Sequence, residues 1–111
     1  MWRVLFDDEC WAWFQTLEEG LQDEINALIA RLEEDGPRVG RPYVDTLKGS
    51  SIPNLKELRV QYRGRPWRVL FAFDPERAAI LLVGGCKAGD KRWYKTRVRI
   101  AEERFRRHLG Q

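Results

Sequence analysis

Hydrophobic residues recur at two different spacings along the chain. Between residues 21 and 32 they lie three or four positions apart, which is the period of an amphipathic α-helix. These residues are Leu21, Ile25, Leu28, Ile29 and Leu32. Between residues 56 and 74 hydrophobic and polar residues alternate instead, which is the period of a β-strand with one buried face. The two periods predict a chain that contains both helices and strands.

The N-terminal third is predicted to form a strand followed by two helices. Residues 2–6, WRVLF, are β-branched and aromatic, which favours a strand. Asp7 or Asp8 can cap the helix that follows. The apolar stripe of that helix is Cys10, Trp13, Phe14 and Leu17. We expect Gly20 to separate it from the second helix and Gly36 to end the second helix.

The rest of the chain is predicted to hold a loop, three strands and a last helix. Residues 38–54 are rich in Gly, Pro and Ser and are expected to form a long loop. Strands are expected at 56–63, 67–74 and 78–85, and the last has the unbroken apolar run of a central strand. Val98, Ala101, Phe105 and Leu109 mark a C-terminal helix. The order β-α-α-β-β-β-α predicts one α+β domain over 1–111, with the helices on one face of a four-stranded, mostly antiparallel sheet.

The alternation puts two arginines on the face of the sheet opposite its apolar side chains. If residues 63–66 form the turn, Arg59 is the diagonal neighbour of Arg68. Two guanidinium groups on one patch repel each other unless an anion lies between them, and their planar shape matches phosphate oxygens. We therefore expect an anion site. The alternative is an ordinary surface ion pair of Glu57 with either arginine, which would contribute little stability.

Charge is distributed unevenly along the chain. Residues 1–37 carry two basic and ten acidic side chains, net −8, whereas residues 38–111 carry 18 basic and seven acidic ones, net +11. A basic region of this size favours a polyanion, usually a nucleic acid, as partner. The alternative is a charged surface that only contacts solvent.

Several classes of protein are not expected. No apolar run approaches the roughly 20 residues of a membrane helix, and acidic residues interrupt the N-terminus where a signal peptide would continue, so we expect a cytoplasmic protein and no membrane partner. Cys10 and Cys86 form no CxxC motif, and His108 is the only histidine. We therefore expect no metal ion, no cofactor and no disulfide framework.

The segment 84–95, GGCKAGDKRWYK, concentrates cations beside aromatic residues. It lacks the GxxxxGK[ST] order of a phosphate-binding P-loop. Cations beside aromatic rings suit RNA, whose phosphates pair with the cations and whose bases stack on the rings. Gly84, Gly85 and Gly89 are expected to let the backbone approach a ligand. Cys86 and His108 are more easily explained as structural residues than as catalysts.

Four segments together resemble one known family. They are VDTLKG, LKELRVQYRGRPWRVLFAFD, ILLVGGCKAGDKRWY and RIAEERFRRHL, and they resemble the HigB-type, phage-derived branch of the RelE/ParE toxin superfamily. The resemblance implies a RelE-like fold and the toxin of a type II toxin–antitoxin system. It also implies an endoribonuclease that cleaves mRNA in the A site of the 30S ribosomal subunit without a metal, by attack of the 2′-hydroxyl on the adjacent phosphate. The implied partner is a helix-turn-helix antitoxin, which can form a hetero-oligomer with the toxin.

The resemblance also implies roles for individual residues. Arg59, Arg68 and Lys87 would hold the scissile phosphate, Glu57 or a lysine would be the base, and Lys91 or Tyr94 the acid. Further RNA-binding positions are expected at Glu57, Lys48, Lys56, Arg63, Arg65, Arg92, Trp93 and Lys95. The chain lacks the histidines that several ribonucleases of the superfamily use, and it has Glu57 where a cation is often found. A ParE-like inhibitor of DNA gyrase and a non-catalytic phage nucleic-acid-binding protein remain alternatives.

Overall fold

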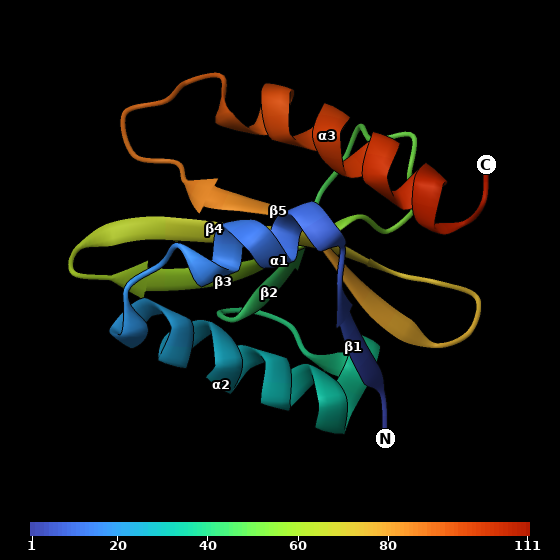
Figure 1. The fold of residues 1–111 in the computed structure, drawn as a ribbon, viewed down its shortest axis with the longest axis horizontal. Coiled ribbons are helices and arrows are strands. Elements are labelled where there is room, and N and C mark those ends of the chain that lie inside the picture. The colour runs from blue at the N-terminus through green and yellow to red at the C-terminus, as the bar shows by residue number, and fades with distance from the viewer.

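The computed structural model describes all residues from 1 to 111, arranged around a single five-stranded sheet (Figure 1). The elements are β1 (Arg3–Phe6), α1 (Asp8–Gln15), α2 (Glu19–Asp35), the short 3-10 helix η1 (Gly36–Arg38), β2 (Val44–Thr46), β3 (Lys56–Tyr62), β4 (Arg65–Phe73), β5 (Ala78–Cys86) and α3 (Trp93–His108). The strand order is β1-β5-β4-β3-β2. β1 runs parallel to β5, and every other pair is antiparallel. The α+β class and the mostly antiparallel sheet are confirmed.

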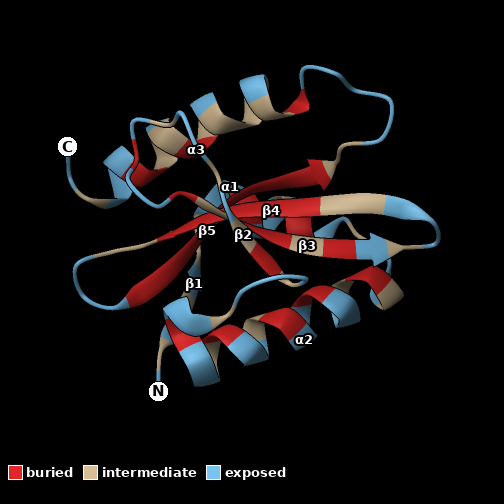
Figure 2. Ribbon diagram, turned by 180° about the vertical axis from the view of Figure 1, so that it is seen from behind, coloured by how far each residue is buried: buried red, intermediate tan, exposed pale blue.

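Helices cover both faces of the sheet, so the expectation of one covered face was wrong. α1 and α2 pack against Leu58, Val69 and Phe71 on one face. α3 packs against Leu70 and Ile80 on the other face. Figure 2 shows β4 and β5 buried between these two layers, and this double burial explains the unbroken apolar run of β5. None of the helices has the length and apolar character needed to cross a membrane.

The first helix begins as predicted but ends earlier. Asp7 is its N-cap, and its Oδ2 atom accepts hydrogen bonds from the backbone N–H groups of Glu9 and Cys10 at 3.0 and 3.2 Å. The break between the helices falls at residues 16–18, so Gly20 is not the break but lies in the first turn of α2. A Cβ atom at Gly20 would collide with the hydroxyl of Tyr62 and force that side chain to shift, so glycine permits close packing of α2 against Tyr62.

The predicted loop at 38–54 contains a fifth strand. β2 pairs with the edge of β3, with Val44 opposite Leu58. The strand is only three residues long and lies in a segment rich in Gly and Pro, which obscures any alternating pattern. The sheet therefore has five strands and not four.

The β3–β4 hairpin has a tighter turn than predicted. Only Arg63 and Gly64 lie between the strands, and both have positive φ angles of 50° and 73°, as in a type I′ turn. The short turn shifts the register, so that Arg59 lies directly opposite Arg68 and not diagonal to it. The two arginines still share one face of the sheet, as the alternation predicted.

Candidate functional site

The structure buries only two charged side chains, and they form an ion pair. Glu57 on β3 is 2% exposed and Arg68 on β4 is 6% exposed. Oε1 of Glu57 lies 3.6 Å from Nε of Arg68. Oε2 of Glu57 lies 2.8 Å from an amino group of Arg59, a residue whose side chain remains 23% exposed. The carboxylate of Glu57 therefore lies between the two arginines, where we expected an external anion. The structure shows the alternative, an ion pair of Glu57 with the arginines.

Tyr94, in the first turn of α3, completes this cluster. Its hydroxyl donates a 2.6 Å hydrogen bond to Oε1 of Glu57. Burial and then the hydrogen bond to the Glu57 carboxylate raise the pKa of Tyr94 above its ordinary value of 10.0, so the hydroxyl is protonated at neutral pH. Lys87 lies over the Tyr94 ring, with Nζ 5.4 Å from its centroid. We refer to Glu57, Arg59, Arg68, Lys87 and Tyr94 as the Glu57 cluster.

The segment between β5 and α3 positions one of its lysines in the cluster and leaves the others exposed. The backbone N–H of Lys87 donates a 3.0 Å hydrogen bond to the carbonyl of Pro66, which holds this residue beside the start of β4. Lys91 and Arg92 are exposed on the loop that follows. Of the five residues predicted to be catalytic, Arg59, Arg68, Lys87 and Tyr94 are therefore brought together, and Lys91 stands nearby in sequence without a contact to them.

Three predicted RNA-binding residues lie on the other face of the sheet. Lys56 donates a 2.8 Å hydrogen bond to Oγ1 of Thr46, on the face that Leu58 shares. Arg63 lies 3.5 Å from Oε1 of Glu18, just before α2, and Arg65 alternates onto the same face. The structure does not bring these three residues to the Glu57 cluster, because the pleat puts Lys56 and Arg65 on the Leu58 face, and Arg63, in the turn, lies over the Tyr62 ring.

Trp93 and two glycines of the GGCKAGDKRWYK segment have packing roles instead of the predicted ligand roles. Trp93 is only 1% exposed and belongs to the core beneath α3, so its ring is not available to stack on a base, and that expectation was wrong. A Cβ atom at Gly84 would collide with the ring of Trp13, and one at Gly85 would lie 3.0 Å from Nε1 of Trp93. These glycines admit tryptophans on both faces of β5 and not a ligand. Gly89, with a φ of 70°, forms the left-handed turn of the exposed loop.

A cleft of about 360 Å³ adjoins the cluster at Tyr94. Its walls are Lys48 and Gly49 on one side and residues of α3 on the other. Lys48 and Lys95 were predicted to bind RNA, and both are exposed and line this cleft. Arg99 also lines it and was missed, although Lys95 and Arg99 are four residues apart and so share one face of a helix.

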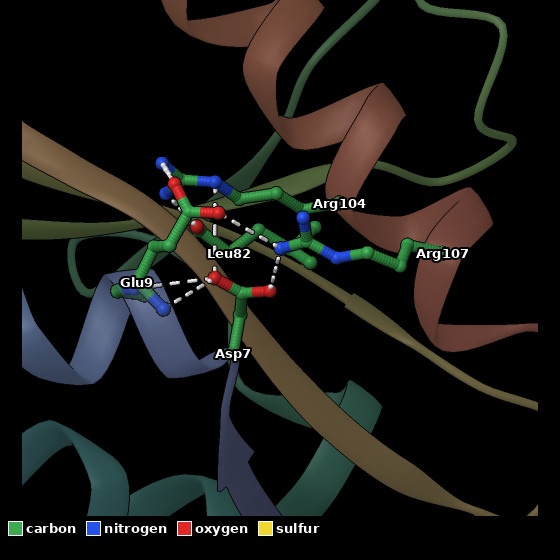
Figure 3. A network of polar contacts seen from close by, with 6 residues as sticks. Asp7, Glu9, Leu82, Arg104 and Arg107 are labelled. Carbon is green, nitrogen blue, oxygen red and sulfur yellow. Dashed lines mark hydrogen bonds and ion pairs between the residues drawn. The ribbon is translucent and has the colours of Figure 1, made fainter.

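A second polar network lies toward the other end of α3 and is structural (Figure 3). Asp7 accepts a 3.0 Å hydrogen bond from Arg107, and Glu9 accepts a 2.9 Å hydrogen bond from Arg104. Arg104 also donates a 2.8 Å hydrogen bond to the carbonyl of Leu82 in β5. These contacts join the start of α1 to the C-terminal half of α3, about 100 residues away in sequence.

The cysteines and the histidine take no part in the Glu57 cluster. Cys10 is fully buried, and burial raises the pKa of its thiol to about 12. His108 is the last residue of α3, and its ring nitrogen lies 2.8 Å from a carboxylate oxygen of Asp74, just after β4. Neither arrangement resembles a nucleophile paired with a base.

The sequence matches proteins of known family over most of its length. Residues 12–106 match the family described as phage-derived protein Gp49-like (DUF891). The chain belongs to the Gp49-like family. Two curated relatives from Mycobacterium tuberculosis (strain ATCC 25618 / H37Rv), HigB2 and HigB3, both named as toxins, are 46% and 47% identical to this Gp49-like chain. They support its place in the HigB-type branch of the RelE superfamily.

The coverage of the two relatives differs. The alignment with HigB2 spans 90% of this chain but 51% of the relative, and the alignment with HigB3 spans 88% and 85%. The Gp49-like chain thus corresponds to about half the length of HigB2. Every residue of the Glu57 cluster lies inside the family match, which leaves out only β1, the start of α1 and the last few residues.

Solved structures show that this Gp49-like chain has the RelE fold. The isolated RelE toxin of E. coli superimposes with a TM-score of 0.63 at 15% identity, covering 90% of this chain and 99% of RelE. The intact E. coli RelBE toxin–antitoxin complex contains a chain that superimposes with a TM-score of 0.60 at 15% identity, covering 77% of this chain and 95% of that one. At such low identity the likeness concerns the fold alone.

Proposed function

We propose that this protein is the toxin of a type II toxin–antitoxin pair and an endoribonuclease that cleaves mRNA in the ribosomal A site. The observation that carries the proposal is the Glu57 cluster, in which two strands, the loop and α3 gather a carboxylate, two guanidinium groups, an ammonium group and a phenol. These groups can bind a phosphate and move protons, which are the two tasks of RNA cleavage by the 2′-hydroxyl. The toxin names of HigB2 and HigB3 support the same proposal.

The proposed reaction begins when a phosphate draws Arg59 away from Glu57. Arg59 is the more exposed of the two arginines that contact Glu57, so its guanidinium can turn to the phosphate and release Oε2 of Glu57. Oε2 of Glu57 then takes the proton of the 2′-hydroxyl while the 2′ oxygen attacks phosphorus. Arg59 and Lys87 stabilise the added negative charge on the phosphate, while the buried Arg68 holds Glu57 in place.

Tyr94 can supply the second proton transfer of the reaction. As the bond from phosphorus to the 5′ oxygen breaks, Tyr94 donates its proton to that oxygen, giving a 5′-hydroxyl end and a 2′,3′-cyclic phosphate. Oε2 of Glu57 then releases its proton to water and Tyr94 takes a proton from water, after which the 2.6 Å hydrogen bond from Tyr94 to Oε1 is restored. Both residues regain their starting states, with no proton gained or lost.

The proposed partner is an antitoxin with a helix-turn-helix domain. The RelE chain in the E. coli complex is bound by its antitoxin RelB, and this chain shares its fold. Residues 38–111 carry the excess of basic side chains, so an acidic antitoxin segment could cover that surface. We infer that the toxin acts in the cytoplasm, where its proposed ribosomal target lies.

The proposal is tested by mapping cleaved ends of mRNA. The wild-type chain is expressed under tight induction, and new 5′-hydroxyl ends are mapped on cellular mRNA. We expect cuts within codons of translated messages, and the double variant R59A/K87A should abolish them. Growth arrest with intact mRNA, or with DNA breaks trapped by gyrase, would instead support a ParE-like activity and reject the nuclease.

The hairpin supplies a matched control for this experiment. The variant R63A/R65A also removes two positive charges, but on the opposite face of the sheet. It should leave the cuts in place. Equal loss in both double variants would show that overall charge matters and that the cluster has no specific role.

A further inference from the structure

The cleft beside Tyr94 has three cationic side chains without an ionic partner. Lys48, Lys95 and Arg99 line it and form no ion pair, whereas eight of the other 17 lysines and arginines do. Cations that converge on a concave surface without partners repel one another, and an anion bound between them would relieve that repulsion.

The one carboxylate of the cleft is hydrogen-bonded to neutral groups, so three cations and one carboxylate give the lining a net charge of +2. Oε2 of Glu102 accepts hydrogen bonds from the hydroxyl of Ser50 at 2.9 Å and from the backbone N–H of Ser51 at 2.8 Å. The backbone bond from Ser51 is the main cause that holds the pKa of Glu102 below its ordinary value of 4.5. Glu102 therefore fixes the segment that carries Lys48 against α3 and keeps both walls of the cleft in place.

We propose that this cleft binds the RNA phosphate on the 3′ side of the cleavage site. The inference rests on the proposed function. Tyr94 belongs both to the Glu57 cluster and to the wall of the cleft. If Tyr94 protonates the leaving 5′ oxygen, the nucleotide that carries this oxygen lies on the Tyr94 side of the scissile phosphate. The next phosphate along that strand then falls in the cleft, where Lys48 and Arg99 bind it from opposite walls.

Binding of that phosphate would help catalysis by positioning the leaving nucleotide, without contact to the reacting atoms. Lys48 and Arg99 are positioning residues in this scheme, since they hold the leaving nucleotide and not the scissile phosphate. Val98, which also lines the cleft, supplies apolar surface on which the sugar can rest. The cleft would thus fix the leaving group in line with the attacking 2′-hydroxyl, an alignment on which the rate depends strongly.

The experiment replaces single phosphates of a synthetic mRNA by neutral methylphosphonates. Ribosomes are loaded with the mRNA so that one codon fills the A site, and single-turnover cleavage by the purified toxin is measured. In the wild type, a methylphosphonate one position 3′ of the cut should slow cleavage about tenfold, as expected for the loss of one charge-assisted contact. The same change one position 5′ of the cut should have little effect.

The protein variant K48A/R99A should slow cleavage of the natural mRNA by a similar factor. In this variant the 3′ methylphosphonate should cause no further loss, because both changes remove the same contact. The control R3A/R38A removes two exposed charges from β1 and η1, far from the cleft, and should behave as wild type.

Two other results would overturn the inference. If K48A/R99A and the 3′ methylphosphonate slow cleavage independently, the cleft does not hold that phosphate. If K48A/R99A cleaves like the control, the cleft is not used at all. Complete absence of cleavage by the wild type on every programmed ribosome would reject the proposed function itself, and so is distinguishable from both.

Discussion

A single carboxylate, that of Glu57, organises the candidate site. It contacts Arg59, Arg68 and Tyr94 at once, and it is almost fully buried. Removing one partner of a buried charge leaves the others unsatisfied, which costs more than the lost contact alone. Changes at this site will therefore alter stability as well as activity, and tests of catalysis must separate the two effects.

Replacing Tyr94 by phenylalanine makes that separation possible. Y94F keeps the ring and removes the hydroxyl that donates to Glu57, so we expect a loss of about 1–2 kcal/mol in the free energy of unfolding. As the proposed acid, Tyr94 should contribute about 100-fold to the rate of cleavage. Urea denaturation and single-turnover cleavage at a temperature where the variant is fully folded measure the two effects.

Tyr43 provides the control for Y94F. Its hydroxyl only accepts a 3.3 Å hydrogen bond from Arg31 on the α2 side of the sheet. Y43F should keep both the stability and the cleavage rate of the wild type. A folded Y94F protein that cleaves at the wild-type rate would rule out Tyr94 as the acid and would favour Lys91 instead.

At the scale of the elements, features that depend on local sequence patterns were predicted, whereas features that depend on pairing between distant segments were not. The apolar stripe of α2 and the alternation of β3 and β4 follow from periods within one segment, so they were read correctly. β2 was missed because three residues show no period, and its identity depends on pairing with β3. The register of the hairpin depended on whether two or four residues formed the turn, and Arg63 is an unusual residue for a type I′ turn.

The sequence predicted those members of the candidate site that share one face of the β3–β4 hairpin, and Lys87, which directly follows β5. Arg59 and Arg68 were placed together by alternation alone. The burial of Trp93 could not be predicted, because it depends on Gly85 of a neighbouring strand. The position of Glu57 between the arginines was left open for a similar reason, since only the three-dimensional packing of α3 decides whether the carboxylate is enclosed or exposed.

The packing of α1 against β5 yields a prediction about Gly84. G84A should lower the free energy of unfolding by about 2 kcal/mol, because the added methyl group collides with the ring of Trp13. A smaller side chain at position 13 should relieve the collision, so G84A in the background of Trp13→Leu should cost less than in the wild type. Urea denaturation of the four proteins gives this coupling directly.

Gly40→Ala is the matched control for the Gly84 prediction. A Cβ atom at Gly40 meets no atom within 4 Å, so this variant should be as stable as the wild type. Equal costs of G84A with and without Trp13 would show that backbone conformation, and not the tryptophan ring, requires glycine at this position.

At the scale of the whole molecule, opposite charges are separated onto opposite layers. Ten of the 17 acidic residues lie between Asp7 and Asp35, on or next to α1 and α2, and the basic residues are enriched in α3. In Figure 1, α2 lies below the sheet, α1 crosses in front of it and α3 lies above it. The two layers meet in the network of Figure 3, where Asp7 and Glu9 bind Arg104 and Arg107. This network attaches the C-terminal half of α3 to α1 and β5. It therefore helps to hold the same helix in the position from which Tyr94, in its first turn, donates to Glu57.

Asp7 has two roles in this network, and two variants distinguish them. Asp7→Asn can still cap α1 but loses its ion pairs with Arg104 and Arg107, whereas Asp7→Ala loses both functions. We expect Asp7→Asn to lower the free energy of unfolding by about 2 kcal/mol and Asp7→Ala by about 3 kcal/mol, because the largely buried Asp7 carboxylate is lost and Arg104 and Arg107 keep only Glu9 as their ionic partner. Asp8→Ala, at the exposed neighbouring position, should cost less than about 1 kcal/mol. Hydrogen exchange should locate the effect of Asp7→Asn in the last turns of α3, and unchanged protection there would mean that apolar packing alone, and not the network, holds this helix on the sheet.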